Sequence, residues 1–287
     1  MKNRIIAFYF VLLLVFGAVF EIMTPDREYS EQEKRNLMQY SDILKNTDRM
    51  GKKFGDNVEK YLTDQYPKRD SIVTIKTAAD ILMGKREAGG VFIGKDNYLI
   101  DTFSEYDKKI FNKNIKNMAE FRKKLAENKI SCRELLVPAS VEIMSNKLPQ
   151  FACHVSQEKL ISEVAKKVPG VIDITSVLKA HNDEQIYYKS DHHWTSVGAY
   201  YAYVQWKKSL GKKAAPLNSW KKEILCDDFK GTTWNKVSLP GTKYQDEIIG
   251  YYHNKKRRVS YNNDYYVANS IYENSYLKGK EKYGVFF

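Results

Sequence analysis

One short run of the sequence gathers side chains suited to proton transfer. Asp191-His192-His193-Trp194-Thr195 precedes a helical pattern that begins near Ser196. A histidine takes up a proton near neutral pH, and a carboxylate beside it selects the ring tautomer and stabilises the imidazolium. In the spacing Asp-x-His, Asp191 reaches the ring of His193 within one tight turn. Asp191 and His193 are therefore candidates for an acid–base pair.

Two other interpretations fit the same residues. The run is typical of a polar turn whose histidines are merely hydrogen-bonded. It is also a candidate metal site, with Asp191, His192 or His193, and His181 as ligands, although no regular ligand spacing such as H-E-x-x-H accompanies it. No C-x-x-C pair occurs, because the cysteines are far apart, at Cys132, Cys153 and Cys226. We therefore predict no metal and no cofactor.

The segments around this run alternate between helices and short apolar strands. Apolar periodicity predicts helices over 54–66, 71–83, 104–127, 156–168 and 196–210. Short apolar runs predict strands at 91–93, 98–100, 135–137 and 171–174, with a tight turn at 94–97. This order predicts an α/β fold with a mostly parallel sheet covered by helices on both faces. The run at 191–193 then lies at the carboxyl edge of an α/β unit, where such folds place their sites.

The pattern changes after Leu210. The remaining residues are irregular and rich in Tyr, Trp, Asn and Lys, with hairpins expected near Gly241 and Asn262-Asn263. From Ala202 to Phe287 there are 16 Lys and Arg against 8 Asp and Glu, so much of the net charge of +12 lies here. A basic surface suits anionic lipid or acidic wall polymers, or serves solubility alone. The N-terminal segment described below predicts export, and an exported chain rarely meets nucleic acid. We therefore expect no nucleic-acid partner.

A basic, aromatic cluster in this region is a candidate glycan-binding surface. Rings stack on sugars and cations pair with acidic groups. An exposed hairpin with solvated charges is the alternative interpretation. The cluster comprises Tyr251, Tyr252, Lys255, Lys256, Arg257 and Arg258.

The N-terminus predicts a membrane segment. Residues 1–4 form a basic head, and residues 5–20 are apolar apart from Gly17. That length approaches the roughly 17–25 residues of a membrane span. We expect the positive head to stay inside and the rest of the chain to lie on the outer face of the membrane. We expect an uncleaved anchor at 1–23 (or a cleaved signal and a secreted protein), a polar linker at 24–50 and a folded domain at 51–287.

The run from Asp191 to Thr195 resembles the signature of the DHHW family of bacterial exported proteins. That family is similar to the alginate O-acetyltransferases and their SGNH-hydrolase-like relatives, whose motif is D-x-H-W. Residues 33–37 resemble the family's E-x-R-x-L segment, 65–70 its Q-[FY]-P-x-R-D helix end, and 91–99 its G-K-D-G-[YW]-L hairpin. Gly231-Thr232-Thr233 is a weaker match. The resemblance runs from about residue 30 to the last residue.

The resemblance implies an SGNH-like three-layer α/β sandwich and acyl-ester chemistry. The protein would be an O-acyltransferase or esterase acting on an extracellular polysaccharide or wall polymer. In that scheme Asp191 orients His193, and His193 is the general base for a serine in a later Asp-Ser turn. A later Gly-x-x-Asn segment helps form the oxyanion site. The resemblance also suggests a separate membrane protein that delivers acyl groups.

The sequence departs from the family at the nucleophile. No Asp-Ser pair follows Trp194, and Asp70-Ser71 lies in a helical pattern ahead of the sheet. Ser140 follows a strand end, but nothing around it forms a nucleophile turn, so we expect a loop serine. Residues 283–287 resemble the strand before Gly-x-x-Asn, so we expect a chain truncated at its C-terminus and lacking the last strand. Because little catalysis survives loss of a triad member, a non-catalytic glycan-binding or degenerate family member is the alternative function.

Overall fold

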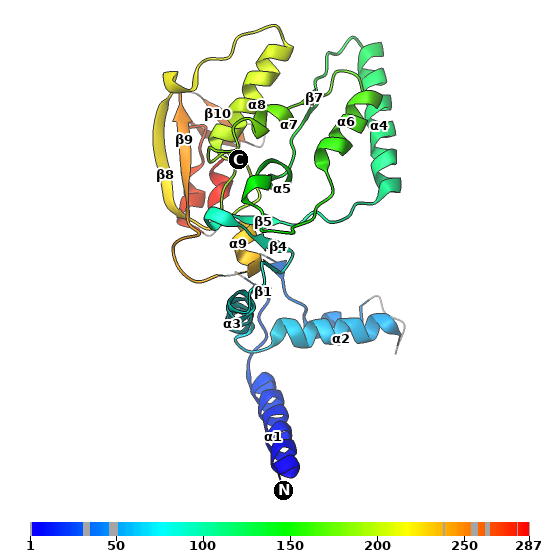
Figure 1. Ribbon diagram of the computed structural model, residues 1–287, viewed down its shortest axis with the longest axis vertical. Helices are drawn as coiled ribbons and strands as arrows, with labels where there is room; N and C mark the ends of the chain where they lie inside the picture. The colour runs from blue at the N-terminus through cyan, green and yellow to red at the C-terminus, as the bar shows by residue number, and fades with distance from the viewer. Residues whose placement is uncertain are drawn as a thin grey trace. The chain divides into compact units, whose positions relative to one another are not determined.

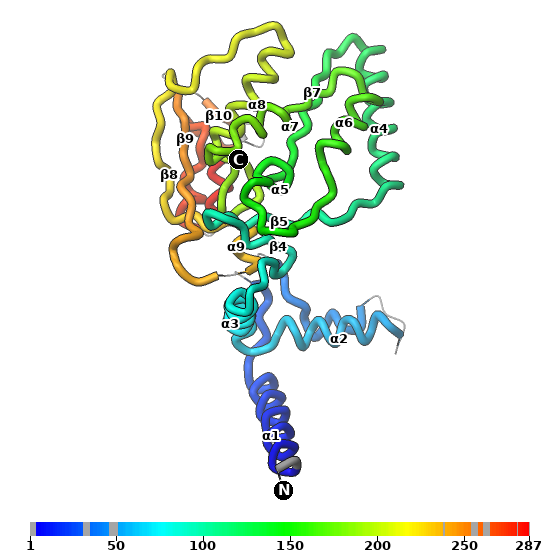
Figure 2. Tube along the Cα trace, in the orientation of Figure 1, coloured from blue at the N-terminus to red at the C-terminus, as the bar shows by residue number. Residues whose placement is uncertain are grey.

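The computed structural model of the protein describes residues 2–30, 35–45, 51–237, 239–253, 258–261, 265–279 and 281–286. The chain divides into two compact units, Met1–Met83 and Gly84–Phe287. Figure 1 labels their helices and strands, and Figure 2 traces the backbone in the same orientation. The expected turn at Asn262-Asn263 and residues 255–257 of the basic cluster lie outside the described residues.

The first unit begins with the apolar helix α1 (Lys2–Met23). Residues Arg4–Met23 have a mean hydropathy of 2.6, and none of the most apolar window is buried. The helix is long and apolar enough to cross a membrane, by length and composition. A signal sequence has the same properties, so both N-terminal interpretations agree with this helix.

The rest of the first unit is held by polar contacts to the end of one helix. Asp64, which is 1% exposed, accepts hydrogen bonds from both terminal nitrogens of Arg35, at 2.8 and 2.5 Å. Gln65 donates to the carbonyls of Arg27 and Met38. Arg35 and Gln65, from the two N-terminal segments compared with the family above, therefore lie at the same helix end, and the described part of residues 24–50 contains short elements of secondary structure. The elements are β1 (Tyr29–Ser30) and β2 (Arg35–Asn36), which pair antiparallel, η1 (Tyr40–Asp42), α2 (Lys52–Gln65) and α3 (Arg69–Leu82).

The second unit contains three of the predicted helices, α4, α6 and α8, with ends that differ by a few residues from the periodicity. Each starts where a side chain caps it: Asp107, Ser156 and Thr195 accept hydrogen bonds from first-turn N–H groups of α4, α6 and α8. The helices are α4 (Lys108–Glu127), α5 (Ser140–Ile143), α6 (Gln157–Lys167), α7 (Thr175–Lys179), α8 (Ser196–Ser209) and α9 (Thr232–Val237). The 3-10 turns are η2 (Lys95–Asn97), η3 (Ser145–Lys147), η4 (Leu217–Ser219), η5 (Asn274–Lys278) and η6 (Lys282–Phe286).

The strands of the second unit form small sheets. They are β3 (Glu87–Ala88), β4 (Val91–Ile93), β5 (Leu99–Asp101), β6 (Leu135–Leu136), β7 (Ile172–Asp173), β8 (Lys221–Phe229), β9 (Asp246–Tyr252), β10 (Val259–Tyr261) and β11 (Tyr266–Ala268). Among the described residues only β6 and β7 pair in parallel. The ladders β3–β4–β5, β8–β9 and β10–β11 are antiparallel.

The mixed α/β class is therefore confirmed, but the expected mostly parallel sheet is reduced to one pair in the described residues. β6 and β7 are two residues long, so they provide few backbone groups for hydrogen bonds to a further strand. The longer pairing connects β8 and β9, which lie side by side in Figure 1 and run in opposite directions. Antiparallel pairing suits connections that return directly along the same sheet.

The expectation of a strand at 283–287 is wrong for the described residues. Residues 282–286 form the 3-10 turn η6. Val285 is fully buried in a core with Phe229 and Ile248, and its carbonyl accepts from the N–H of Glu273 at 2.9 Å. A compact turn buries Val285 while Tyr283 remains at the surface of the same core.

Two apolar cores meet at the chain segment that leads to Asp191. Ile186 and Tyr187 belong to a core formed with β4, β5, α5, α7 and α8. Tyr188 belongs to a second core with residues of β8 and β9. Successive side chains of extended chain point to opposite faces, so the two tyrosines are buried on opposite sides, at 2% and 1% exposure. The turn that follows is thereby fixed by both cores.

We expect Gly198→Ala to destabilise the second unit by about 1–3 kcal/mol, the usual range for overpacking. An added Cβ would lie 2.3 Å from the carbonyl oxygen of Ile186 and 3.1 Å from Cβ of Trp194. Chemical denaturation of the variant checks this. The matched control is Lys208→Ala at an exposed position of the same helix, and equal stability of the two variants would contradict the close packing of α8 against residues 186–194.

Candidate active site

The Asp-His-His run forms the tip of a narrow hairpin-like loop. Tyr187 and Trp194 face each other across an antiparallel bridge. Below them the N–H of Thr195 donates to the carbonyl of Ile186 at 2.9 Å. The loop is also tied to the β4–β5 hairpin, since the N–H of Leu99 donates to the carbonyl of Lys189 at 2.7 Å. Its position is therefore set by backbone hydrogen bonds on both sides.

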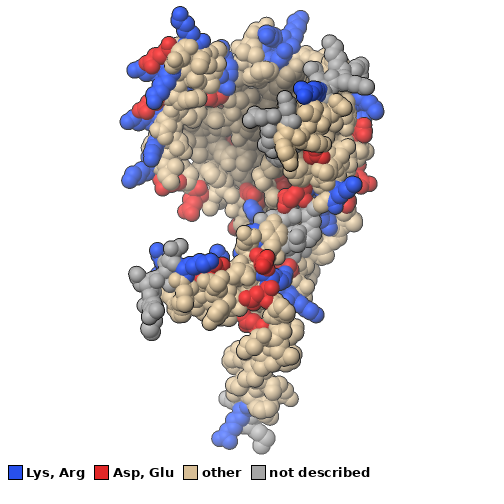
Figure 3. Space-filling view, turned by 180° about the vertical axis from the view of Figure 1, so that it is seen from behind, with Lys and Arg blue, Asp and Glu red and all other residues tan. Residues whose placement is uncertain are grey.

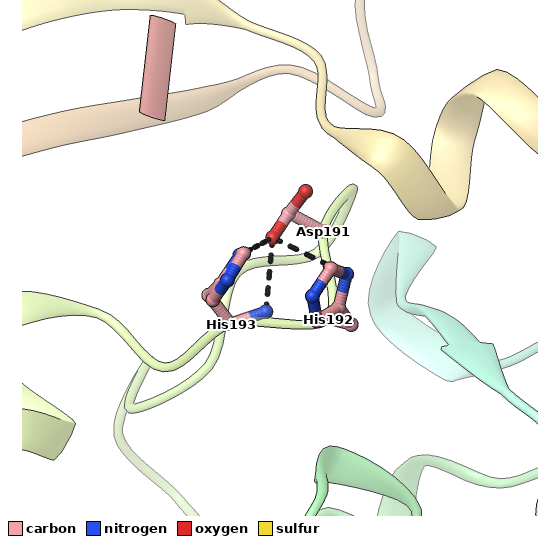
Figure 4. A group of neighbouring side chains, drawn as sticks. All are labelled: Asp191, His192 and His193. Carbon is pink, nitrogen blue, oxygen red and sulfur yellow. Dashed lines mark hydrogen bonds and ion pairs between the residues drawn. The ribbon is translucent and has the colours of Figure 1, made fainter. Parts of the chain in front are cut away.

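Asp191 holds the imidazole of His193. The Nδ1 atom of His193 lies 2.5 Å from Oδ1 of Asp191, and the backbone N–H of His193 donates to the same oxygen at 2.9 Å. Figure 4 shows both contacts, with His192 on the other side of the carboxylate. Because Nδ1 carries the donated proton in this arrangement, Nε2 is the ring atom that accepts a proton. The predicted pair is thus assembled, with Asp191 in the orienting position.

The second oxygen of Asp191 is bound by the loop after β8. The N–H and the hydroxyl of Thr232 donate to Oδ2 at 2.7 and 3.0 Å. Gly231 lies so close that an added Cβ would meet Asp191 atoms at 2.2 Å. The short Gly-Thr-Thr segment at 231–233 therefore forms a tight cradle around the carboxylate, which explains why a glycine precedes the threonine.

These hydrogen bonds keep Asp191 charged although it is buried. Its side chain is 2% exposed, and burial alone would raise the pKa. The donors from His193 and Thr232 outweigh burial and lower the pKa of Asp191 to about 2. Burial lowers the pKa of His192. Its Nδ1 lies 2.7 Å from the Thr232 hydroxyl.

A second buried carboxylate supports the loop from beneath. Asp246 at the start of β9 accepts from the N–H and the hydroxyl of Ser190 at 2.8 and 2.6 Å, and from the N–H of Lys189 at 3.0 Å. The Ser190 hydroxyl oxygen accepts in turn from the N–H of Gly231 at 3.1 Å. Asp246 therefore holds the Asp191 loop and the Gly231 cradle together. Sequence reasoning missed this role, although an aspartate next to the apolar run of β9 is a detectable signal.

The exposed side of His193 borders a cavity of about 290 Å³. The ring of Tyr283 stacks on His193 with centroids 3.9 Å apart and an interplanar angle of 11°. Burial, with the charge of Asp191, raises the pKa of Tyr283 to about 12, so the phenol is neutral at physiological pH. Lys230 and Lys282 also line this cavity. No feature of the sequence pointed to Tyr283.

The alternative metal site has the right residues but a saturated carboxylate. Ligand atoms of Asp191, His192 and His193 lie within 4.8 Å of one another. Each Asp191 oxygen, however, already accepts two hydrogen bonds, which uses the roughly four acceptor positions of a carboxylate. His181 lies elsewhere, bound to Glu184 at 2.8 Å and stacked on Tyr201. The arrangement fits orientation of an imidazole better than cation binding.

The structure also places the serines that sequence reasoning considered. Ser71 lies in α3 of the first unit. Ser140 is the first residue of α5 and 3% exposed, so it is a buried helix residue and not the expected loop serine. Within the described residues no hydroxyl is hydrogen-bonded to Nε2 of His193.

We expect the stability conferred by Asp191 to depend on pH in one direction. Its folded pKa of about 2 lies below the ordinary value of 3.8, so the stabilisation is fully present above about pH 5 and declines as the pH falls toward 2. The gap in unfolding free energy between the protein and Asp191→Asn should be constant from pH 7 to about 5 and narrow by about 1 kcal/mol at pH 3. Denaturant titrations at each pH measure it, and a constant gap would contradict a charged, hydrogen-bonded Asp191.

Comparison with known proteins places the chain in a family. A model of the DHHW protein family matches residues 73–287. A solved DHHW family protein from Eubacterium siraeum is 20% identical with a TM-score of 0.53, over 68% of this chain and 69% of that one. Bacillus cereus PatB1 is 18% identical with a TM-score of 0.49, over 57% and 59%. The O-acetyltransferase domain of Pseudomonas putida AlgJ is 18% identical with a TM-score of 0.44, over 56% and 63%.

The alignment thus spans less than two thirds of the PatB1 and AlgJ chains. No curated protein matches the sequence. The family match extends over more than half of the chain and includes the Asp191 loop, the Gly231 cradle and Tyr283. The likeness to the Eubacterium siraeum protein extends to the fold. The chain therefore belongs to the DHHW protein family.

Proposed function

We propose that this protein takes part in acyl-ester chemistry as an SGNH-like O-acyltransferase or esterase acting on an extracellular polysaccharide or wall polymer. One observation carries the proposal: the 2.5 Å contact between Asp191 and Nδ1 of His193 leaves Nε2 as the proton acceptor. The D-x-H-W resemblance assigns the same roles to these two residues. In this proposal no cofactor is needed, because proton transfer and an ionised carboxylate suffice.

The proposed steps follow from the pair. Nε2 of His193 removes the proton of an attacking hydroxyl while its oxygen bonds to the acyl carbonyl carbon. Asp191, ionised at neutral pH because its pKa is about 2, stabilises the imidazolium that forms. The imidazolium then returns the proton to the leaving oxygen as the original C–O bond breaks. A sugar hydroxyl as final acceptor gives transfer, and water gives hydrolysis.

The attacking hydroxyl is not assigned to a residue. In the resemblance it belongs to a serine of a later Asp-Ser turn, and the printed sequence has no Asp-Ser pair after Trp194. The second candidate function, a non-catalytic or degenerate glycan-binding surface protein, is favoured by one contact. Tyr283 covers a face of the His193 ring at 3.9 Å, and aromatic rings are common contacts for sugars.

The proposed location is the outer face of the bacterial cytoplasmic membrane. The unburied apolar helix α1 supports it, together with the basic residues at the start of that helix. Figure 3 shows Lys and Arg side chains around the outer edge of one face of the second unit, which suits an anionic surface. The proposed partners are the surface polymer, the membrane and a membrane protein that delivers acyl groups.

We expect His193→Ala to lower polymer acylation by about 10²–10⁴-fold in initial rate, the usual contribution of a general base. The measurement is the initial rate at which acyl esters accumulate on the surface polymer of cells that produce the protein, compared with cells that lack the gene. Asp191→Asn should cause a similar loss, because it disturbs the orientation of the ring.

The matched control is His181→Ala, which removes a histidine bound to Glu184 and remote from the Asp191 cradle. Acylation should be unchanged in this variant. If His193→Ala cells retain full acylation that depends on the gene, the enzymatic proposal is wrong and the glycan-binding alternative remains.

We also expect deletion of residues 1–23 to abolish membrane attachment, because α1 supplies the apolar length of a span. In the intact chain the protein should remain in the membrane fraction after an alkaline wash and be digested by protease added outside whole protoplasts. Release by the wash, together with a mature N-terminus beyond residue 23, would indicate a cleaved signal instead.

A further inference from the structure

A second cavity, next to that of His193, has an unusual lining. It measures about 370 Å³, and eight of its twelve lining residues are aromatic, with none charged. Trp194 lines it from the loop just before α8, and Tyr200 and Tyr203 line it from the middle of α8. Trp220, Tyr251 and Tyr283 line it from the elements that follow. We call this cavity the aromatic groove.

The groove is built on fixed elements. Trp194 is part of the bridge with Tyr187. Beneath the groove the Tyr272 hydroxyl accepts from the N–H of Tyr251 at 2.7 Å and donates to its carbonyl at 3.0 Å. A lining whose rings are already held in place loses little conformational entropy on binding. Trp220 adds a buried indole N–H that has no hydrogen-bond partner among the described residues, which a ligand oxygen that reached it would satisfy.

The chemistry of the lining selects one class of ligand. Flat aromatic faces pack against the C–H faces of pyranose rings, and phenol and indole groups offer hydrogen bonds at their edges. An anionic sugar would need a cation to offset the loss of its hydration, and the lining provides none. A neutral sugar requires no such partner. Tyr251 belongs both to the groove and to the basic cluster at 251–258, but the lining of the groove is uncharged, whereas the cluster suits anionic glycans.

The groove adjoins the candidate active site. Tyr283 lines both cavities. Its ring is stacked on His193 with centroids 3.9 Å apart, and it lies tilted against the ring of Phe286 with centroids 5.1 Å apart. Phe286 also lines the groove. A sugar chain lying in the groove would thus lead to the exposed side of His193. Its next hydroxyl groups would enter the smaller cavity.

We propose that the aromatic groove is the subsite for a neutral pyranose segment of the glycan on which His193 acts. The assignment of chemistry to His193 rests on the function proposed above, whereas binding in the groove does not. The polymer is accordingly one with uncharged stretches of pyranose rings.

The test is calorimetric titration of the detergent-solubilised full-length protein with three probes. These are chitohexaose, a neutral β-1,4-linked hexamer, hexagalacturonate, an anionic hexamer, and decanoate, an acyl chain. We expect chitohexaose to bind. Trp220→Ala and Tyr203→Ala should each weaken binding about tenfold, the effect of losing one aromatic contact, and Trp220→Phe should restore much of it.

Two controls separate this proposal from the chemistry. Trp206→Ala removes a 41% exposed indole of the same helix that does not line the groove, and it should bind chitohexaose as the unmodified protein does. His193→Ala should also bind normally, because His193 lines only the smaller cavity. Loss of acylation with normal binding in His193→Ala supports both proposals.

Three outcomes would overturn the neutral-glycan subsite. They are no binding of chitohexaose, binding that is unaffected by Trp220→Ala and Tyr203→Ala, and displacement of chitohexaose by decanoate at these residues. Preference for hexagalacturonate would assign glycan binding to a basic surface instead. Normal chitohexaose binding combined with full acylation in His193→Ala cells would contradict the enzymatic proposal. It would still support the neutral-glycan subsite.

Discussion

Placing an ionised carboxylate inside a protein costs free energy that only dense hydrogen bonding offsets. Asp191 meets this requirement with four donors from two chain segments, the loop itself and the segment at 231–233. Much of the second unit is arranged to deliver those donors. The two cores fix residues 186–188, α8 starts directly behind the loop, and β8 ends where Gly231 must approach. The orientation of His193 is a consequence of this requirement.

The two buried aspartates near the loop have different structural roles. Asp191 is held charged by strong donors, including the imidazole. Burial raises the pKa of Asp246 despite the donors from Ser190 and Lys189, so it is the weaker acid of the two. Asp246 accepts hydrogen bonds from the backbone N–H groups of Lys189 and Ser190 and from the side chains of Ser190 and Gln185. One carboxylate therefore orients the imidazole, and the other fixes the loop that carries it.

Much of this arrangement follows from the sequence by local physics. The helices appear in apolar periodicity, the β4–β5 turn in Gly-Lys-Asp-Asn, and the Asp191–His193 contact in the one-residue spacing. The contacts that the sequence did not predict are those between residues far apart in the chain. Thr232 reaches Asp191 across 41 positions, Asp246 reaches Ser190 across 56, and Tyr283 stacks on His193. The family resemblance also favoured a strand at the end of the chain, whereas residues 282–286 form a 3-10 turn in which Val285 is buried. Local sequence patterns do not determine which distant residues come into contact.

The close approach of Gly231 to Asp191 has a consequence for the evolution of the family. Its hydrogen lies where a methyl group would overlap the Asp191 carboxylate, so selection on the glycine lasts only as long as that carboxylate is needed. A lineage that ceased to use the histidine would be free to accept alanine or serine at this position once the aspartate had changed. Paired loss of the glycine and the aspartate in related genomes would thus mark where the site fell out of use, and glycine retained beside aspartate would mark where it still matters.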